Sequence, residues 1–415
     1  MKIWLKFIIG IALGGVIALL IPREPAALNI LNQISLICIN IGKYAVLPLL
    51  FFSLTVAVYE LKAERKLAVL LKHYFLWLAL FTLGCALLGI IAGIVLPALK
   101  LPQPPPEIAG LAQFSLVDSL KEHIFPDNLL RIFTQVGFSI FPLLVLAFLI
   151  GLSLDYEKQF TRPVFQLADG ISRIAYHINS LVIEIFWIAI IALSAARFLL
   201  IKNLQGGEAY LSFFIVLSIC LLLIIFVGLP LFLYFTNRRK NPFLWLHANL
   251  GLILASLFSG DNYLSTALLV RLGKENMSVS RKIGSLYSLS AFFSKAGTAL
   301  VVSLSLIFLR KSALGGEIPF LEYLWIFGFS IVASLLVGLF ATSFPTSGAY
   351  AALAFLTMGY IQPALPADKY LDFGQIAPLV LGVSALLDSL ITSAIVFKIA
   401  QEIEAAEDID PQRWI

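Results

Sequence analysis

Long apolar runs recur from one end of this chain to the other, and each is long enough to cross a lipid bilayer. The hydrocarbon core of a bilayer is about 30 Å thick, which an α-helix spans with roughly twenty residues. The clearest runs are residues 4–21, 34–58, 67–96, 132–154, 181–201 and 210–235. Because lipid offers no hydrogen-bond partner to an open strand edge, such runs fold as helices. The sequence therefore predicts an all-α, multi-pass membrane protein.

Composition narrows the functional classes. Only 13% of the 415 residues are charged, against about 25% in an ordinary soluble domain. The net charge of +5 does not indicate nucleic-acid binding, since the basic residues collect in short loops where they orient the spans. Three scattered cysteines and no HExxH or Walker-type motif predict neither a metal site nor a cofactor. We expect a protein that is not an enzyme.

The basic loops also predict an orientation. Lysine and arginine follow the second, fourth and sixth runs, at residues 62–66, 158–162 and 238–240. The positive-inside rule then places the N-terminus in the cytoplasm, and we expect the C-terminus there too, in a plasma (inner) membrane. The proline-rich connection of residues 100–130 falls outside. An acidic tail ends the chain.

From about Trp245 onward, polar residues interrupt the apolar segments at their middles. Residues 243–258 and 264–270 flank the polar sequence 259–263, and residues 324–340 and 349–360 flank a second one that contains Pro345 and Gly348. Each arm is short for a full crossing, and each interrupted segment precedes a long apolar one, at 283–309 and 376–399. Paired interruptions of this kind indicate re-entrant hairpins that form a transporter's binding site. An ordinary span followed by a Ser/Thr-rich loop fits the pattern equally well.

Several short stretches occur in the order and spacing of one known family. They are residues 42–53 (GKYAVLPLLFFS), 125–128 (FPDN), 271–275 (RLGKE), Gly297-Thr298, Pro345 with Gly348, and 386–388 (LLD). With them the chain resembles the dicarboxylate/amino acid:cation symporters, which include glutamate and aspartate transporters. The resemblance implies eight transmembrane helices plus two re-entrant hairpins, arranged as inverted repeats in an elevator-type homotrimer.

The same resemblance implies a division of the chain into static and moving parts. Scaffold helices 1–2 would occupy residues 1–66, and scaffold helices 4–5 residues 131–205. Helix 3 of the transport domain would occupy residues 67–99, after which residues 100–130 form the extracellular connection. The rest of the transport domain, residues 206–415, would hold helix 6, the first hairpin, helix 7, the second hairpin, helix 8 and the acidic tail.

The resemblance also implies a substrate site between the hairpin tips and the last two spans. Its residues would be Asn262, Tyr263, Thr298, Thr346, Ser347, Gly348, Asp388 and Thr392. Asp388 matches the carboxylate that accepts an α-amino group; alternatively it is structural, held by the hydroxyls of Ser384 or Thr392. The family's arginine for a side-chain carboxylate falls at Ile391, and its alternative position is Gly260. We therefore expect a small neutral amino acid, or another small amine or organic acid.

The cation-site motif is altered. The family's NMDGT reads Ser294-Lys-Ala-Gly-Thr298, so Ala296 replaces a sodium-ligating aspartate and Lys295 a methionine. Two further ligands, an asparagine and an aspartate, fall at Ile395 and Ile399. Because hard cations need several oxygen ligands, sodium coupling is not expected.

Lys295 is the main candidate for coupling, together with Ser294 and Asp261. A charged group in mid-bilayer is costly unless it is paired or faces a cavity, so it marks a function by default. Three interpretations stay open. The ammonium replaces a bound cation, or it releases its proton during the cycle and couples transport to protons, or it forms a permanent ion pair with Asp261.

Secondary active transport of a small molecule is thus the leading interpretation. A non-transporting receptor or sensor on the same fold is a second one, favoured by the missing cation ligands and disfavoured by the polar hairpin tips. An anion channel is a third, because the family is associated with anion conductance. Uptake into liposomes would separate the three.

Overall fold

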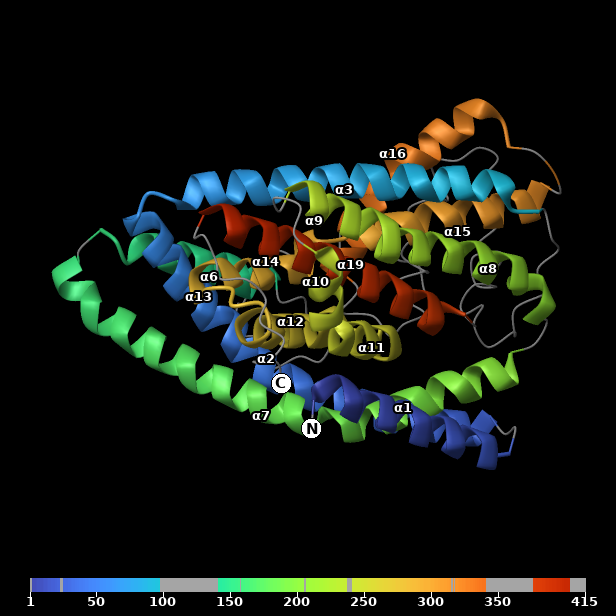
Figure 1. Ribbon diagram of the computed structural model, residues 1–415, viewed down its shortest axis with the longest axis horizontal. Helices are drawn as coiled ribbons and strands as arrows, with labels where there is room; N and C mark the ends of the chain where they lie inside the picture. The colour runs from blue at the N-terminus through green and yellow to red at the C-terminus, as the bar shows by residue number, and fades with distance from the viewer. Residues whose placement is uncertain are drawn as a thin grey trace.

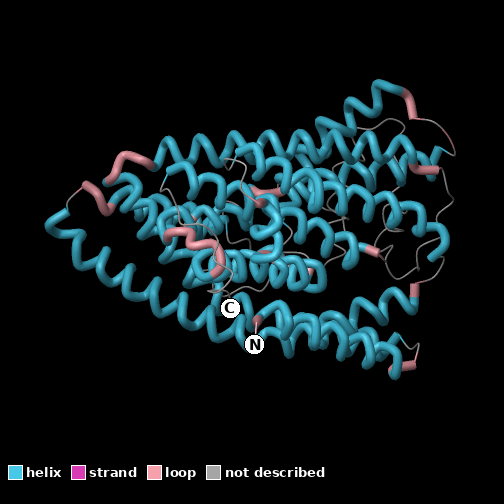
Figure 2. Tube along the Cα trace, viewed as in Figure 1, coloured by secondary structure: helices cyan, strands magenta, loops and turns pink. Residues whose placement is uncertain are grey.

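The structure is a computed structural model that describes residues 2–22, 25–97, 141–156, 158–204, 207–236, 241–314, 316, 318–340 and 376–403. Within these ranges every regular element is a helix, and short loops join the helices (Figures 1 and 2). Six described helices are long and apolar enough to cross a membrane, and a seventh span arises if one bent pair counts as a single span. The prediction of an all-α, multi-pass membrane protein is confirmed.

Four helices pack against one another along one side of the molecule (Figure 1). They are α1 (Ile3–Leu20), α2 (Pro25–Ala63), α6 (Phe141–Ser153) and α7 (Lys158–Asn203). We call them the α2–α7 group, because the two longest helices have 39 and 46 residues. Helix α7 begins well before the predicted residue 181, since its first half is amphipathic and too polar for an apolar-run prediction.

The remaining helices surround α19 (Ala377–Ile403), which lies in the interior. In its most apolar window 83% of the residues are buried, against 28–39% in the other candidate spans. Against it pack α3 (Leu67–Val95) and α15 (Ala296–Leu314), and α16 (Phe320–Phe340) packs on these two helices. The continuous run of α8 (Gly207–Leu223), η2 (Ile224–Gly228) and α9 (Leu229–Thr236) lies on the outside. We call these helices, with the hairpin and the short helices described next, the α19 group.

The first interrupted segment forms a helical hairpin. Its first arm is α10 (Pro242–Ala248) and α11 (Leu250–Ser259), bent by 50° at their junction, and its second arm is α12 (Asn262–Glu275). The side-chain amide of Asn276 donates to the Ala248 carbonyl at 3.0 Å, so the end of the second arm is bonded to the bend in the first. The chain reverses at Gly260, whose φ of +62° is a conformation that glycine adopts without steric cost. The predicted reversal is confirmed.

The long segment after this hairpin is not the single helix that the sequence predicts. It consists of α13 (Arg281–Gly284), α14 (Leu286–Phe293) and α15, with a break at Ser294 and Lys295. Neither residue type stops a helix by itself, so the break is a tertiary feature. The tip and second arm of the second hairpin, the connection of residues 100–130 and the acidic tail lie outside the described residues.

Candidate functional site

Two breaks in regular structure lie next to the middle of the unbroken helix α19. They are the hairpin tip before α12 and the break before α15. The eight predicted site residues that the structure describes lie at these places: Asp261, Asn262, Tyr263, Ser294, Lys295, Thr298, Asp388 and Thr392. Thr346, Ser347 and Gly348 lie outside the described residues.

Asp261 organises the hairpin tip. It is the N-cap of α12, where its carboxylate accepts hydrogen bonds from the backbone N–H groups of Tyr263 at 2.9 Å and Leu264 at 3.0 Å. The free N–H groups and the positive end of the helix dipole both favour a carboxylate there. Its other oxygen forms an ion pair at 3.0 Å with Lys43 of α2. An ion pair of Asp261 with Lys295, one of the three interpretations above, is therefore wrong for this conformation.

A second cation reaches the tip from the α2–α7 group. Arg197 of α7 is 9% exposed, and its guanidinium donates to the carbonyls of Phe258 and Ser259, both at 3.3 Å. These carbonyls end α11, where the helix offers unpaired acceptors and partial negative charge. Sequence reasoning assigned no role at the tip to Lys43 or Arg197. Their one signal is a cation inside an apolar span, which is itself unusual.

Asp388 caps the helix that begins after the break. Its carboxylate accepts the backbone N–H of Thr298 at 3.1 Å and the Thr298 hydroxyl at 2.6 Å. A Cβ at Gly297 would lie 2.3 Å from the Leu387 Cβ and 2.9 Å from the Asp388 nitrogen, so only glycine allows α15 and α19 this close. The expected structural partners of the carboxylate, the Ser384 and Thr392 hydroxyls, are wrong, because these donate to backbone carbonyls instead.

Ser294 and Thr392 join the break to α19. The Ser294 hydroxyl donates to the Asp388 carbonyl at 3.3 Å, and the Thr392 hydroxyl donates to the Ser294 oxygen at 2.5 Å. These bonds hold the non-helical backbone at Ser294, where ψ is +86°. Lys295, the next residue, is 1% exposed and lies within electrostatic range of both Asp388 and Asp261. The site thus holds one buried ammonium and two carboxylates.

A small polar cavity of about 10 Å³ lies between α12, α14 and α19. Hydroxyl, amide and carboxyl side chains line most of it: Asn262, Ser265, Thr266, Ser290, Asp388, Ser389 and Thr392, with Leu269. Three of these were predicted as substrate residues. The cavity has room for about one water molecule.

The aliphatic replacements in the cation motif are also buried here. Ala296, Ile391, Ile395 and Ile399 are all 0% exposed. In the described part of the chain, no group of three or more His, Cys, Asp or Glu side chains gathers that could hold a metal ion. The charged side chains described at the site are those of Asp261, Asp388, Lys43, Arg197 and Lys295. Carboxylates next to a helix N-terminus can receive an ammonium group, and the buried ammonium can receive a carboxylate.

Comparison with known sequences agrees with this arrangement. No curated protein matches the chain. The sequence model of the sodium:dicarboxylate symporter family, however, matches residues 3–399, which is nearly the whole chain. The interrupted helices, the hairpin and the capped aspartate thus occur in a multi-pass membrane protein of the symporter type, and the chain belongs to the sodium:dicarboxylate symporter family.

Proposed function

We propose that this chain is a secondary active transporter for a small neutral amino acid or organic acid, and that it works by elevator-type alternating access. It does not require sodium and is coupled to protons through Lys295. Membership of a symporter family supports the transport of a small molecule across a membrane. The proposed substrate class, coupling ion and motion are argued from the residues of the site and from the contacts between the helix groups.

The observation that carries the proposal is the ammonium of Lys295, which is buried and within electrostatic range of Asp388 and Asp261. A symporter uses a bound cation to neutralise carboxylates in the site before they move with the substrate. Here a covalently attached cation occupies that place, and Ala296 stands where the family motif has a sodium-ligating carboxylate. A lysine can also give up its proton in a water-poor site and recover it on the other side of the membrane.

Substrate selection follows from the charges that the site has and lacks. Asp388 offers oxygen lone pairs beyond the two bonds from Thr298, so it can accept a substrate ammonium. Ile391 and Gly260, at the family's two arginine positions, offer no partner for a second carboxylate. A neutral amino acid fits this set of groups, and so does a small organic acid that uses the Lys295 ammonium.

For the motion, we propose that the α2–α7 group is the scaffold and that the α19 group moves past it, in a homotrimer joined through the scaffold. The polar contacts between the groups support this division, because they lie at the hairpin and α13 while α19 itself is enclosed within its own group. The membrane would be the plasma (inner) membrane, with both chain ends in the cytoplasm.

Purified protein in liposomes tests the proposal directly. Radiolabelled alanine, serine, aspartate and succinate are supplied under an imposed proton gradient, with sodium present or replaced by choline. We expect proton-driven uptake of a neutral amino acid or an organic acid that is the same in both media. Uptake that stops without sodium would overturn sodium independence, and no uptake of any small amine or acid would overturn transport.

Substitution of Lys295 tests the coupling. Lys295→Met should abolish the dependence of uptake on the proton gradient while counterflow exchange of substrate persists. Lys398→Met is the matched control, because Lys398 is equally buried at 3% exposure but pairs with Glu402 within α19, away from the site. If Lys295→Met keeps the pH profile of the control variant, Lys295 has no part in coupling.

A further inference from the structure

Asp261 lies between two lysines that belong to different groups of helices. Lys43 of α2 pairs with its carboxylate at 3.0 Å, and the two side chains are 26% and 15% exposed. Lys295 is buried, lies within electrostatic range of Asp261 and belongs to the same group of helices. One partner is thus on the scaffold of the proposed transporter, and the other is attached to the part that moves.

We propose that Asp261 exchanges its cationic partner during the transport cycle, from Lys43 in the position seen here to Lys295 when the hairpin leaves the scaffold. Lys43 thereby acts as a positioning residue that holds the hairpin tip in its docked position. This inference rests on the proposed elevator motion. It adds that Lys43 stabilises one end state of that motion, the docked position.

The physical reason is the cost of an unpaired charge. A carboxylate that loses its partner in a low-dielectric region is strongly destabilised. Lys43 cannot follow the hairpin, because α2 is held against α7 and α6 along its length. Lys295 follows it, because the bonds of Ser294 tie the break to α19. When the hairpin leaves the scaffold, the Lys295 ammonium therefore moves with Asp261 and can replace the Lys43 ammonium, which stays on α2.

Arg197 does not undergo such an exchange. It bonds the carbonyls of Phe258 and Ser259, which are neutral groups at a helix end. On release these carbonyls can be satisfied by water, whereas the carboxylate of Asp261 keeps its charge. The pair of Lys43 with Asp261 is thus the contact whose loss must be compensated.

A cysteine pair can report the docked position without any knowledge of the substrate. The hydroxyls of Ser53 on α2 and Ser288 on α14 lie 3.4 Å apart across the two groups. The double variant Ser53→Cys with Ser288→Cys should cross-link with Hg²⁺ when the hairpin is docked against α2. Cys38, Cys85 and Cys220 are replaced by serine in this background. A cavity of about 590 Å³ that includes Ser53 in its wall gives the reagent access.

The two lysines should shift this cross-linking in opposite directions. Lys43→Met removes the docked partner, so the initial rate should fall about fivefold, the size of a modest coupling between sites. Lys295→Met removes the partner of the released state, so the rate should rise or stay at its maximum.

Lys202→Met serves as the control. Its ammonium bonds the carbonyls of Ala18, Leu19 and Ile21 within the α2–α7 group, so it should leave the rate unchanged. An unchanged rate in Lys43→Met, or a fall in both Lys43→Met and Lys295→Met, would overturn the proposal. The cross-linking assay needs no substrate, so it can fail independently of the uptake assay. If the two cross-linking rates shift in opposite directions but no uptake is found, only the transport proposal is overturned. If uptake is normal but the cross-linking rates do not shift, only the partner exchange is overturned.

Discussion

Asp388 shows how one side chain in the site serves both structure and function. Its two oxygens receive the backbone N–H and the hydroxyl of Thr298, so they satisfy a helix start that would otherwise be buried without partners. The same oxygens are the ones that a substrate ammonium would approach. A substrate therefore meets a carboxylate that is already fixed in place, and it does not have to order that carboxylate on binding.

The bond from the Thr298 hydroxyl can be tested by substitution. Thr298→Val keeps the shape but leaves one buried carboxylate oxygen without its donor, which should lower the free energy of unfolding by about 1–3 kcal/mol. Reversible unfolding in mixed detergent micelles measures this change. Thr82→Val is the control, because the buried Thr82 hydroxyl donates only to Leu78 in its own helix. Equal losses in the two variants would contradict a special role of the carboxylate bond.

Buried or half-buried cations form a second pattern, at the scale of helices. Four of them bond the last carbonyls of a neighbouring helix: Lys62 at α6, Arg197 at α11, Lys202 at α1 and Lys311 at α3. Helix C-termini carry partial negative charge and unpaired acceptors, so a cation is stabilising there. An intramembrane lysine or arginine in this chain therefore often caps the C-terminal end of a neighbouring helix. Lys295 is a different case, because it interacts electrostatically with two carboxylates.

The sequence predicted the elements better than their breaks. Span positions follow from apolar length, and the reversal at Gly260 follows from a polar interruption. The break at Ser294 and Lys295 could not be predicted from the local sequence, because it depends on Asp388, some ninety residues away in the chain. The start of α7 was missed because half of that helix is amphipathic.

Within the site, residue identities were predictable from the family motif, whereas their partners were not. The motif placed Asp388, Thr298 and Lys295 correctly near one another. It could not indicate that Lys43 pairs with Asp261, since that contact depends on how α2 packs against the hairpin. Long side chains reach several positions, and only the packed structure selects one.

The close approach of α15 and α19 yields a prediction about helices. Gly297→Ala would place a Cβ 2.3 Å from the Leu387 Cβ, so the two helices must separate, at a cost of about 1–3 kcal/mol in the free energy of unfolding. Gly84→Ala in α3 is the matched control. A Cβ there meets no atom within 4 Å, so better helix propensity should make this variant neutral or more stable by up to about 1 kcal/mol. A Gly297→Ala protein as stable as the control in the same detergent titration would contradict this packing.

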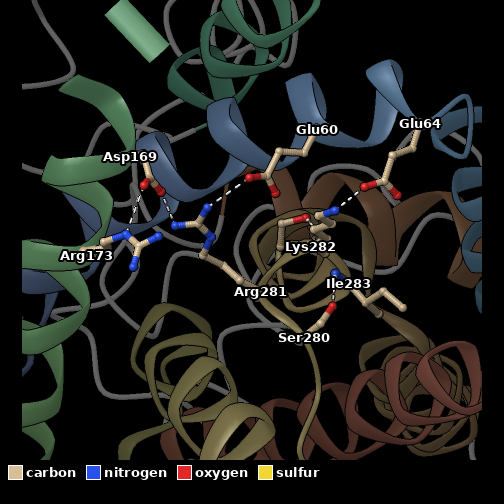
Figure 3. A network of polar contacts seen from close by, with 9 residues as sticks. Glu60, Glu64, Asp169, Arg173, Ser280, Arg281, Lys282 and Ile283 are labelled. Carbon is tan, nitrogen blue, oxygen red and sulfur yellow. Dashed lines mark hydrogen bonds and ion pairs between the residues drawn. The ribbon is translucent and has the colours of Figure 1, made fainter. Parts of the chain in front are cut away.

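At the scale of the whole molecule, most of the described polar contacts between the two groups of helices lie at two levels. One is the hairpin, from its tip with Lys43 and Arg197 to the pair of Arg271 on α12 with Glu184 on α7. The other is α13, where Arg281 lies between Asp169 of α7 and Glu60 of α2 and Lys282 pairs with Glu64 (Figure 3). The 590 Å³ cavity borders this second level, with Glu60, Arg281 and Lys282 in its wall. Contacts of this kind can break and re-form as the groups move, which an interdigitated apolar interface cannot do as readily.

The contact of Lys282 with Glu64 should make docking depend on pH. The hydrogen bond from the Lys282 ammonium, opposed by slight burial and helped by the charges of Lys282 and Lys66, holds the pKa of the Glu64 carboxyl below its usual range. For a carboxyl with a lowered pKa, the stabilisation of the docked state is complete above the ordinary value of about 4.3. It is lost as the pH falls through the lowered value. Because both side chains are about one third exposed, salt should weaken it too.

Cross-linking of the Ser53 and Ser288 cysteine pair measures this effect. At neutral pH and low salt, Glu64→Gln should cross-link more slowly than the unsubstituted pair, and the two rates should converge as the pH falls below about 4.3. Convergence is also expected at neutral pH in about 1 M salt, where the screening length is about 3 Å. Glu402→Gln is the control, because Glu402 pairs with Lys398 inside α19 and does not reach the α2–α7 group. Equal rates of Glu64→Gln and the unsubstituted pair at neutral pH and low salt would show that the groups are held by the apolar contacts and the hairpin tip instead.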